Sequence, residues 1–131
     1  MDHEPDAATR FAGHVARLRS GGVMSIDETA PGPPVRIDGY SIGVADGLEG
    51  PGPHAGEMHP DGDEFLYVVS GALELILDDG DENGIGAETT VRLGAGDAYV
   101  VPRNVWHRLE AIEPSCLVHV TPGPGGAYRP R

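Results

Sequence analysis

The chain has 131 residues and a mass of 13.7 kDa, which is the size of one domain. Its nine basic residues, all arginine, against 21 acidic residues give a formal net charge of -12, so we expect neither nucleic acid nor an anionic membrane surface as a partner. The absence of lysine also excludes Schiff-base catalysis and a P-loop phosphate site.

The remaining composition points to an all-β protein. Twenty glycines, 12 prolines and 5% aromatic residues are typical of many tight turns between short strands. A single cysteine, Cys116, can form neither an internal disulfide nor a Cys-rich zinc site, which favours a reducing, cytoplasmic setting. No apolar run approaches the roughly 20 residues that span a bilayer, and the N-terminus lacks the pattern of a signal peptide.

Residues 1–22 are expected to form a helical segment. After a frayed start at residues 1–5, Asp6 can cap a helix over residues 7–19, and Gly21 with Gly22 would end it. We expect this helix to pack over the domain or a partner subunit. Its apolar residues at helical spacing are Phe11, Val15 and Leu18.

Residues 23–121 are expected to form a β-sandwich or barrel, because short apolar runs alternate with turn signals and no βαβ rhythm occurs. Residues 46–53 are expected to be a loop and residues 60–63 a turn. The tail, residues 122–131, is rich in proline and glycine and is expected to be flexible. The expected strands are residues 23–27, 35–45, 54–59, 64–70, 72–78, 88–93, 98–101, 105–112 and 115–121, of which 35–45 is either one strand or a pair of strands broken near Gly39.

The acidic stretch 78–87 contains half of an EF-hand calcium loop. Asp79, Asp81, Asn83 and Gly84 reproduce the pattern D-x-D-x-N-G. The twelfth position is Thr90 where a bidentate glutamate is needed, and strands flank the loop where helices are needed. A solvated hairpin turn is therefore the favoured interpretation, with calcium binding as the alternative.

Most of the candidate functional residues lie in the stretch Gly52 to Gly71, which spans the third and fourth expected strands. Residues two apart share a face of a strand, so Glu57 and His59 would point the same way. Glu64 follows after a turn and can face the same interior, and His107 is a fourth candidate from a distant strand. Two imidazoles and two carboxylates can hold a divalent metal ion.

The spacing of these residues resembles that of the cupins, a family of small jelly-roll β-barrels. Their first motif, G-x5-H-x-H-x(3,4)-E-x6-G, is similar to the spacing of Glu57, His59, Glu64 and Gly71. Their second motif, G-x5-P-x-G-x2-H-x3-N, is similar to Gly96, Pro102, Asn104 and His107. The resemblance implies a cupin barrel with metal ligands Glu57, His59, Glu64 and His107.

This chain departs from the family pattern at three positions. Glu57 stands where the family has its first metal-binding histidine, Asn104 where it has a glycine, and Ala111 where it has a terminal asparagine. Asparagine tolerates the left-handed conformation that a tight turn requires. His54 is an alternative first ligand if a bulge near Gly56 turns it inward. The oxygen-rich ligand set favours Mn, Fe, Ni or Zn, and the resemblance does not choose among them.

Two functions remain open at this point. The first is a metal-dependent enzyme that acts on a small polar metabolite by oxygenase, isomerase or lyase chemistry. The second is a non-catalytic cupin that has lost the metal and binds a small molecule. In either case the family resemblance implies a homodimer, with residues 1–22 or 23–44 at the interface. Polar candidates near the barrel mouth are Tyr40, Tyr67, Tyr99, Arg36, Arg103 and His119, and an arginine there can hold a carboxylate or phosphate group.

Overall fold

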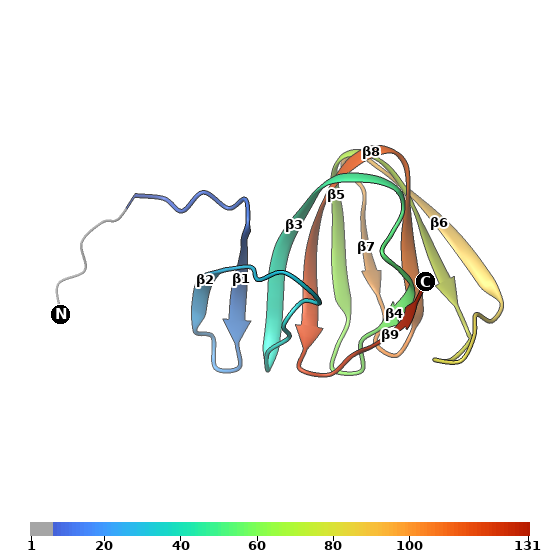
Figure 1. The fold of residues 1–131 in the computed structure, drawn as a ribbon, viewed down its shortest axis with the longest axis horizontal. Helices are drawn as coiled ribbons and strands as arrows, with labels where there is room; N and C mark the ends of the chain where they lie inside the picture. The colour runs from blue at the N-terminus through green and yellow to red at the C-terminus, as the bar shows by residue number, and fades with distance from the viewer. Residues whose placement is uncertain (1–6) are drawn as a thin grey trace.

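The structure is a computed structural model that describes residues 7–131, and within these residues the chain is all-β, with nine strands and no helix. Figure 1 shows that most of the strands curve into a barrel, while the first two form a hairpin beside it. The strands are β1 (His14–Arg19), β2 (Met24–Glu28), β3 (Gly39–Pro51), β4 (His54–Met58), β5 (Glu64–Asp78), β6 (Glu88–Gly94), β7 (Ala98–Val101), β8 (Trp106–Gly123) and β9 (Ala127–Pro130).

Two long strands, β5 and β8, are the centre of the barrel. They are antiparallel to each other, from Phe65 opposite Val120 to Asp78 opposite Trp106. β5 also pairs with β6 and β7, and β8 also pairs with β3 and β4. β4 pairs on its other side with the C-terminal strand β9. The strands that carry the expected metal ligands, β4, β5 and β8, are therefore direct or next neighbours.

The core lies inside the barrel, formed by the side chains that point inward from the strands. Alternation along β5 buries Leu66 and Val68 and leaves Phe65 and Tyr67 about 40% and 37% exposed on the outer face. At the bend near Gly71 the register shifts, and the buried positions change parity to Leu73 and Leu75. The buried hydrophobic cluster comprises Leu66, Val68, Leu73, Leu75, Leu93, Val101 and Leu117.

The expected N-terminal helix is wrong. The part of residues 7–19 that is regular is the strand β1, which pairs with β2 on one side and β3 on the other. Gly21 and Gly22 have φ of 95° and 90° and turn the chain into β2, so these two glycines close a hairpin. Cross-strand pairing outweighs a helical spacing that rested on three apolar residues. Asp6, the expected cap, and the expected frayed residues 1–5 lie outside the described residues.

Three further boundaries differ from the sequence-based expectation. The expected loop 46–53 belongs largely to β3, which continues through two register shifts to Pro51. The paired segments 64–70 and 72–78 form one strand, as do 105–112 and 115–121. The tail, expected to be flexible, contains β9, whose Arg129 is buried. Residues 7–131 include no helix with the length and apolar character that crossing a membrane requires.

Candidate metal centre

Four side chains from three strands and one turn meet inside the barrel. Glu57 lies near the end of β4, directly opposite His107 at the start of β8. His59 follows β4 by one residue, and Glu64 is the first residue of β5. Residues 60–63 form the turn between His59 and Glu64. The backbone N–H of Asn104 donates a hydrogen bond to the carbonyl oxygen of His59 at 2.9 Å and so fixes the start of this turn. All four residues predicted from the sequence are therefore brought together.

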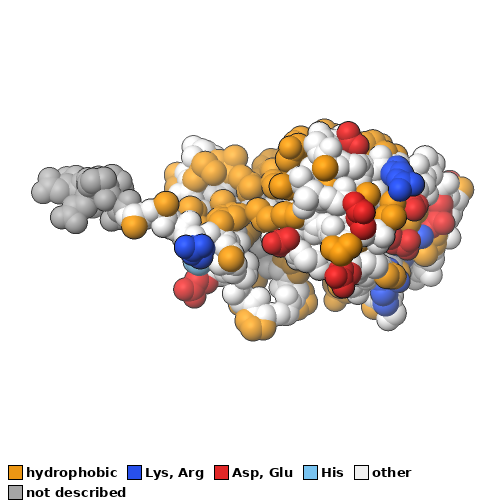
Figure 2. Space-filling model, turned by 90° about the horizontal axis from the view of Figure 1, so that it is seen from above, with side chains coloured by type: hydrophobic (Ala, Val, Ile, Leu, Met, Phe, Trp, Pro, Cys, Tyr) orange, Lys and Arg blue, Asp and Glu red, His pale blue; other side chains and the backbone are white. Residues whose placement is uncertain are grey.

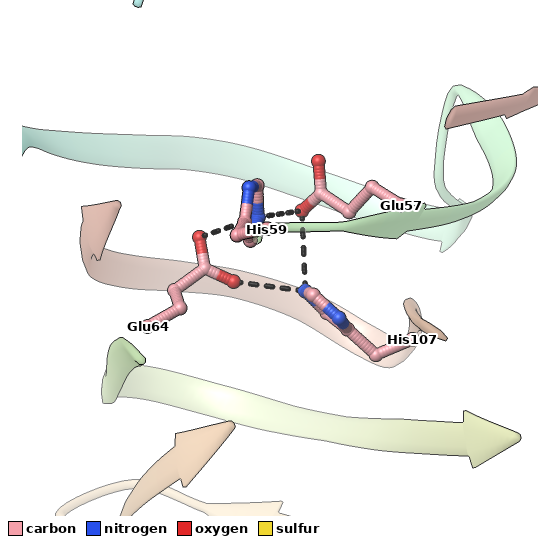
Figure 3. A group of neighbouring side chains, drawn as sticks. All are labelled: Glu57, His59, Glu64 and His107. Atoms are coloured by element: carbon pink, nitrogen blue, oxygen red, sulfur yellow. Dashed lines mark hydrogen bonds and ion pairs between the residues drawn. The ribbon is translucent and has the colours of Figure 1, made fainter. Parts of the chain in front are cut away.

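The distances among these four side chains suit a shared ion (Figure 3). Nε2 of His107 lies 2.9 Å from Oε1 of Glu64 and 3.4 Å from Oε1 of Glu57. Nε2 of His59 lies 3.6 Å from the nearest oxygen of each of the two carboxylates. One candidate ligand atom from each residue lies within 4.8 Å of the other three. The four atoms thus surround a small common volume.

Hydrogen bonding presents Nε2 of His107 to the centre. Its Nδ1 lies 2.9 Å from the carbonyl oxygen of Val105, which can only accept, so Nδ1 carries a proton. Burial alone would lower the pKa of His107, but hydrogen bonds to Glu57 and Glu64 raise it to about 10. Without an ion, His107 is therefore an imidazolium held between two carboxylates. A metal ion would replace this proton at Nε2.

The pKa of Glu57 and the burial of His59 also bear on whether these residues fit a metal ion. Burial alone would raise the pKa of Glu57, but hydrogen bonds with His107, His54 and His59 hold it well below its usual range. His59 is 5% exposed, and neither of its ring nitrogens has a hydrogen-bond partner within the described residues. An unpaired buried imidazole facing two carboxylates is costly for a protein and is what a metal ligand requires. The donor set therefore fits a divalent ion.

A second layer of hydrogen bonds fixes the orientation of Glu64. The hydroxyl of Thr121 donates to Oε2 of Glu64 at 2.6 Å, and Nδ1 of His119 lies 3.0 Å from the same hydroxyl. Since the hydroxyl hydrogen points at Glu64, Nδ1 of His119 is the donor to Thr121. Burial lowers the pKa of His119, which keeps its ring neutral. Gly43 makes room for this ring, because a Cβ there would lie 2.5 Å from Nε2 of His119.

His54 does not replace Glu57 in the group. The bulge that was expected near Gly56 is present as a register shift between β4 and β9. It places Nε2 of His54 3.4 Å from Oε2 of Glu57, whereas His59 and His107 approach Oε1. His54 therefore contacts the first ligand, and it does not join the group of four.

Two cavities reach the centre, and Glu57 and His54 line both. The larger, of about 530 Å³, lies between the β2–β3 loop, β4 and the chain from Pro124 to Tyr128, and Arg36 lines it. The smaller, of about 400 Å³, has an apolar wall that includes Leu48, Leu73, Leu109 and Ala111. A small molecule can therefore approach the centre from either of two cavities.

The other residues expected at the mouth lie elsewhere. Tyr67 points outward from β5, Tyr99 packs against the core, and Arg103 is exposed outside both cavities. Tyr40 lines a separate hollow beside Leu18 and Pro122. Sequence reasoning missed Tyr128, which lines the larger cavity, because the tail was expected to be flexible. The alternation of Ala127 and Arg129 with Tyr128 was the available signal for a strand.

The tail is held by a buried ion pair next to the centre. Nη1 and Nη2 of Arg129 donate to the two carboxylate oxygens of Asp78 at 2.8 and 2.9 Å, and the guanidinium lies 4.3 Å from the ring centroid of Trp106. This hydrogen bonding to Arg129 lowers the pKa of Asp78 to about 2. The pair fixes β9 beside β4, with Tyr128 opposite Glu57.

The acidic loop behaves as a hairpin turn. Asp79 accepts a hydrogen bond from the backbone N–H of Ala87, and Asp81 accepts one from Asn83. Across residues 7–131, the carboxylates of this loop do not converge on a common point as those of the barrel do. The residues that match half of an EF-hand loop therefore stabilise a hairpin turn.

Comparisons with known proteins agree with this architecture. A family model described as a cupin domain matches residues 49–121. No curated protein sequence matches the chain. A cupin-2 domain containing protein from Shewanella frigidimarina NCIMB 400 superposes with a TM-score of 0.52 and 24% identity, over 73% of this chain and 84% of that chain.

Two enzymes are among the other similar solved structures. Oxalate oxidase, in complex with the substrate analogue glycolate, superposes with a TM-score of 0.53 and 21% identity, over 68% of this chain and 45% of the enzyme chain. Oxalate decarboxylase gives a TM-score of 0.52 and 22% identity, over 68% of this chain and 23% of the enzyme chain. The chain spans less than half of either enzyme, and the likeness is one of fold.

Proposed function

The chain belongs to the cupin domain family, and on this premise we propose that it is a metal-dependent enzyme acting on a small, polar, anionic metabolite. The observation that carries the proposal is His59, whose two buried ring nitrogens are unpaired and which faces Glu57 and Glu64. A structural histidine at this depth would have a hydrogen-bond partner. With His107, the group offers two imidazoles and two carboxylates, and the two carboxylate charges match those of a divalent cation.

The ligand types suggest which ions to test. Imidazole and carboxylate together suit Mn, Fe(II), Ni and Zn. When bound, such an ion supplies Lewis-acid or redox chemistry, which covers oxygenase, isomerase and lyase reactions. The likeness to oxalate oxidase and oxalate decarboxylase is compatible with this range but rests on less than half of each enzyme chain.

The larger cavity suggests the charge of the metabolite. Arg36 lines this cavity, and among residues 7–131 its guanidinium is in no ion pair. In a chain with 21 acidic residues, an unpaired arginine beside the centre favours a ligand that brings its own carboxylate or phosphate. His54 lines the same cavity and lies 3.4 Å from Glu57, so it can contact both Glu57 and a bound molecule.

The metal is tested by elemental analysis of protein prepared without a metal-affinity tag and reloaded separately with Mn, Fe(II), Ni and Zn. We expect one equivalent of at least one ion, and at least tenfold weaker retention in His59→Ala and His107→Ala. His14→Ala is the matched control, because His14 lies in β1 away from the centre. Protein that retains none of the four ions, with the site variants and the control indistinguishable, would refute the metal.

The charge of the metabolite is tested on the loaded protein by thermal shift. The probes are inorganic phosphate and a series of short mono- and dicarboxylates. Arg36→Gln should abolish the shift that the best anion gives, whereas Arg103→Gln, in an exposed arginine outside the cavity, should leave it unchanged. Equal shifts in the two variants would refute the role of Arg36 while leaving the metal proposal intact.

The alternative is a binding protein without a metal. It is supported by the short contact between His107 and Glu64, which lets an imidazolium and two carboxylates stabilise one another without an ion. In that case anions would shift the melting temperature equally with and without a chelator.

We place the protein in the cytoplasm, and its free thiol, Cys116, is compatible with that setting.

A further inference from the structure

The larger cavity beside the candidate centre has a wall built mainly of rings. Four prolines and one tyrosine, Tyr128, line it. The prolines are Pro33, Pro34, Pro53 and Pro124. A proline ring fixes its own backbone, so this part of the wall keeps its shape without a ligand. The cavity therefore presents flat, apolar surfaces that are already in place.

Tyr128 lies on the inner side of this wall. It pairs directly with Glu57 across β4 and β9, which lie beside each other in Figure 1. Directly opposed residues of an antiparallel pair share a face of the sheet, so Tyr128 projects to the same side as Glu57. Tyr128 is nevertheless 61% exposed. Its ring is therefore open to the cavity and is not packed into the core.

The neighbours of Tyr128 in the chain fix its position. Arg129 points to the opposite face of β9, where it binds the carboxylate of Asp78. Nε of Arg131 donates to the carbonyl oxygen of Gly52 at 2.6 Å. The backbone that carries the tyrosine ring is thus held on its C-terminal side by two arginines. A ligand that packs on this ring loses little affinity to ordering of the protein.

The cavity reaches both the candidate centre and Arg36. Gly126 lines the cavity, and a Cβ there would lie 3.9 Å from Nδ1 of His59, so backbone alone separates this part of the wall from the ring. Burial is the largest cause of the lowered pKa of His119, and the positive charge of Arg36 contributes to it, which places the guanidinium on the barrel side of its loop. An occupant of the cavity is therefore within reach of Arg36 and of His59.

The cavity offers few polar partners to a ligand. Besides the candidate metal ligands, the side chains in its wall that can form hydrogen bonds are those of Arg36, His54 and Tyr128. A sugar acid would bring several hydroxyl groups, and a buried hydroxyl without a partner costs free energy. A cavity of about 530 Å³ is in the range that holds drug-sized ligands and is far larger than a two-carbon acid needs. A molecule with an apolar body and one polar end satisfies both conditions.

The charge of the protein favours a single carboxylate over several. The chain has a net charge of -12, and most of the acidic side chains visible in Figure 2 lie on the barrel. Within the described residues, Arg36 is the one arginine that lines the cavity. One guanidinium compensates one carboxylate, whereas a polyanion would be repelled by the surrounding charge.

We infer that the larger cavity binds a monocyclic aromatic carboxylate, whose ring packs between Tyr128 and the prolines while its carboxylate binds Arg36. Aromatic rings pack favourably on tyrosine in offset or edge-to-face geometry. Proline rings are common partners of aromatic surfaces, as in the recognition of proline-rich peptides. The inference rests on the proposed function, because it names the class of anion that Arg36 holds beside the centre.

Isothermal titration calorimetry on the full chain tests this ligand class. The probes are benzoate, cyclohexanecarboxylate, propionate and glucuronate, each of which carries one carboxylate. Benzoate should bind about two- to tenfold more tightly than cyclohexanecarboxylate, which is the effect expected of aromatic pairing, and the other two probes should bind more weakly still. The order should be the same in metal-loaded and chelated protein, because neither Tyr128 nor the prolines belong to the candidate ligand set.

Substitutions of Tyr128 locate the ring. Tyr128→Ala should weaken benzoate binding about tenfold and leave propionate binding within about twofold, since only benzoate packs on the tyrosine. Tyr128→Phe keeps the aromatic face and should bind benzoate like the wild type. Tyr67→Ala is the matched control, because Tyr67 lies on the outer face of the barrel. Circular dichroism shows whether each variant is folded, and the comparison of probes on the wild type requires no variant.

The outcomes separate this inference from the proposed function. Equal affinities of the wild type for benzoate and propionate overturn the aromatic ligand, and so does glucuronate as the tightest probe. A folded Tyr128→Ala variant that binds benzoate like the wild type also overturns it. The proposed function survives these three results if Arg36→Gln still abolishes anion binding and a metal is still retained. Failure of all four probes to bind overturns both the anion site and the aromatic ligand, while elemental analysis reads the metal separately.

Discussion

Replacing Arg129 by methionine tests how β9 is held against the barrel. Arg129 donates to both oxygens of Asp78, donates a third hydrogen bond to the carbonyl oxygen of Asp81, and stacks on Trp106. The Asp78 side chain is 1% exposed, so the substitution leaves a buried carboxylate without its cation. Removing one partner of such a pair costs about 3–5 kcal/mol. Methionine retains much of the apolar volume against Trp106.

The structure places the expected loss near the lower end of that range. Asp78 would still accept hydrogen bonds from the backbone N–H groups of Gly80 and Gly86, at 2.9 and 3.3 Å. We therefore expect Arg129→Met to lower the free energy of unfolding by about 3 kcal/mol and the melting temperature by roughly 10–15 °C. Urea denaturation at pH 6 measures the first quantity. Arg92→Met is the control, because Arg92 is an exposed arginine within a strand, β6.

The pKa of Asp78 determines how the stability difference between wild type and Arg129→Met changes with pH. The pKa of Asp78 is about 2 in the fold against 3.8 in the unfolded chain, so the pair contributes about 2 kcal/mol above pH 3.8. That contribution is lost as the pH falls through 3.8 towards 2. The difference between wild type and Arg129→Met should therefore narrow by about 1 kcal/mol between pH 6 and pH 3. A difference below 1 kcal/mol at pH 6, or one that widens in acid, would refute the reasoning.

Three further substitutions probe the centre and its support. Thr121→Val removes the hydroxyl that donates to Glu64; we expect tenfold to 100-fold weaker metal binding in an equilibrium competition assay, and unchanged affinity would show that this hydrogen bond does not matter. Gly43→Ala would place a Cβ 2.5 Å from Nε2 of His119; we expect a loss of about 1–3 kcal/mol in urea denaturation, and an unaffected midpoint would mean that the ring moves freely. Asn104 has a φ of 67°, so Asn104→Val should cost about 1–3 kcal/mol while Asn104→Gly is tolerated; equal stabilities would contradict this.

The meeting of four candidate ligands could be predicted from the sequence because much of the information that places them is local. The first motif fixes the separation of Glu57, His59 and Glu64 along two consecutive strands, and the second motif supplies His107. The strand alternation then dictates that these side chains share the interior. The left-handed conformation expected of Asn104 is confirmed by its φ of 67°. For these four residues, spacing along the chain was sufficient to predict which side chains meet.

The errors occur where partners distant in the sequence decide the local structure. Residues 14–19 are a strand because Ala16 pairs with Ile26 and Ile42, and no local pattern names those partners. The tail forms β9 because Arg129 finds Asp78, 51 residues away. A tail rich in glycine and proline has a weak intrinsic preference, so one buried ion pair and one neighbouring strand decide its conformation. Tyr128 was missed for the same reason.

The route by which the ligands come together also bears on the kinetics of folding. His107 and Glu64 are 43 residues apart and meet only when β5 and β8 have paired along their length. Pairing between strands so far apart in the sequence forms late and slowly during folding. The complete set of ligands for an ion is therefore present only after the barrel has formed. Binding should therefore slow unfolding and leave the folding rate nearly unchanged. A bound ion would therefore stabilise the finished barrel against unfolding and have little effect on the rate of folding.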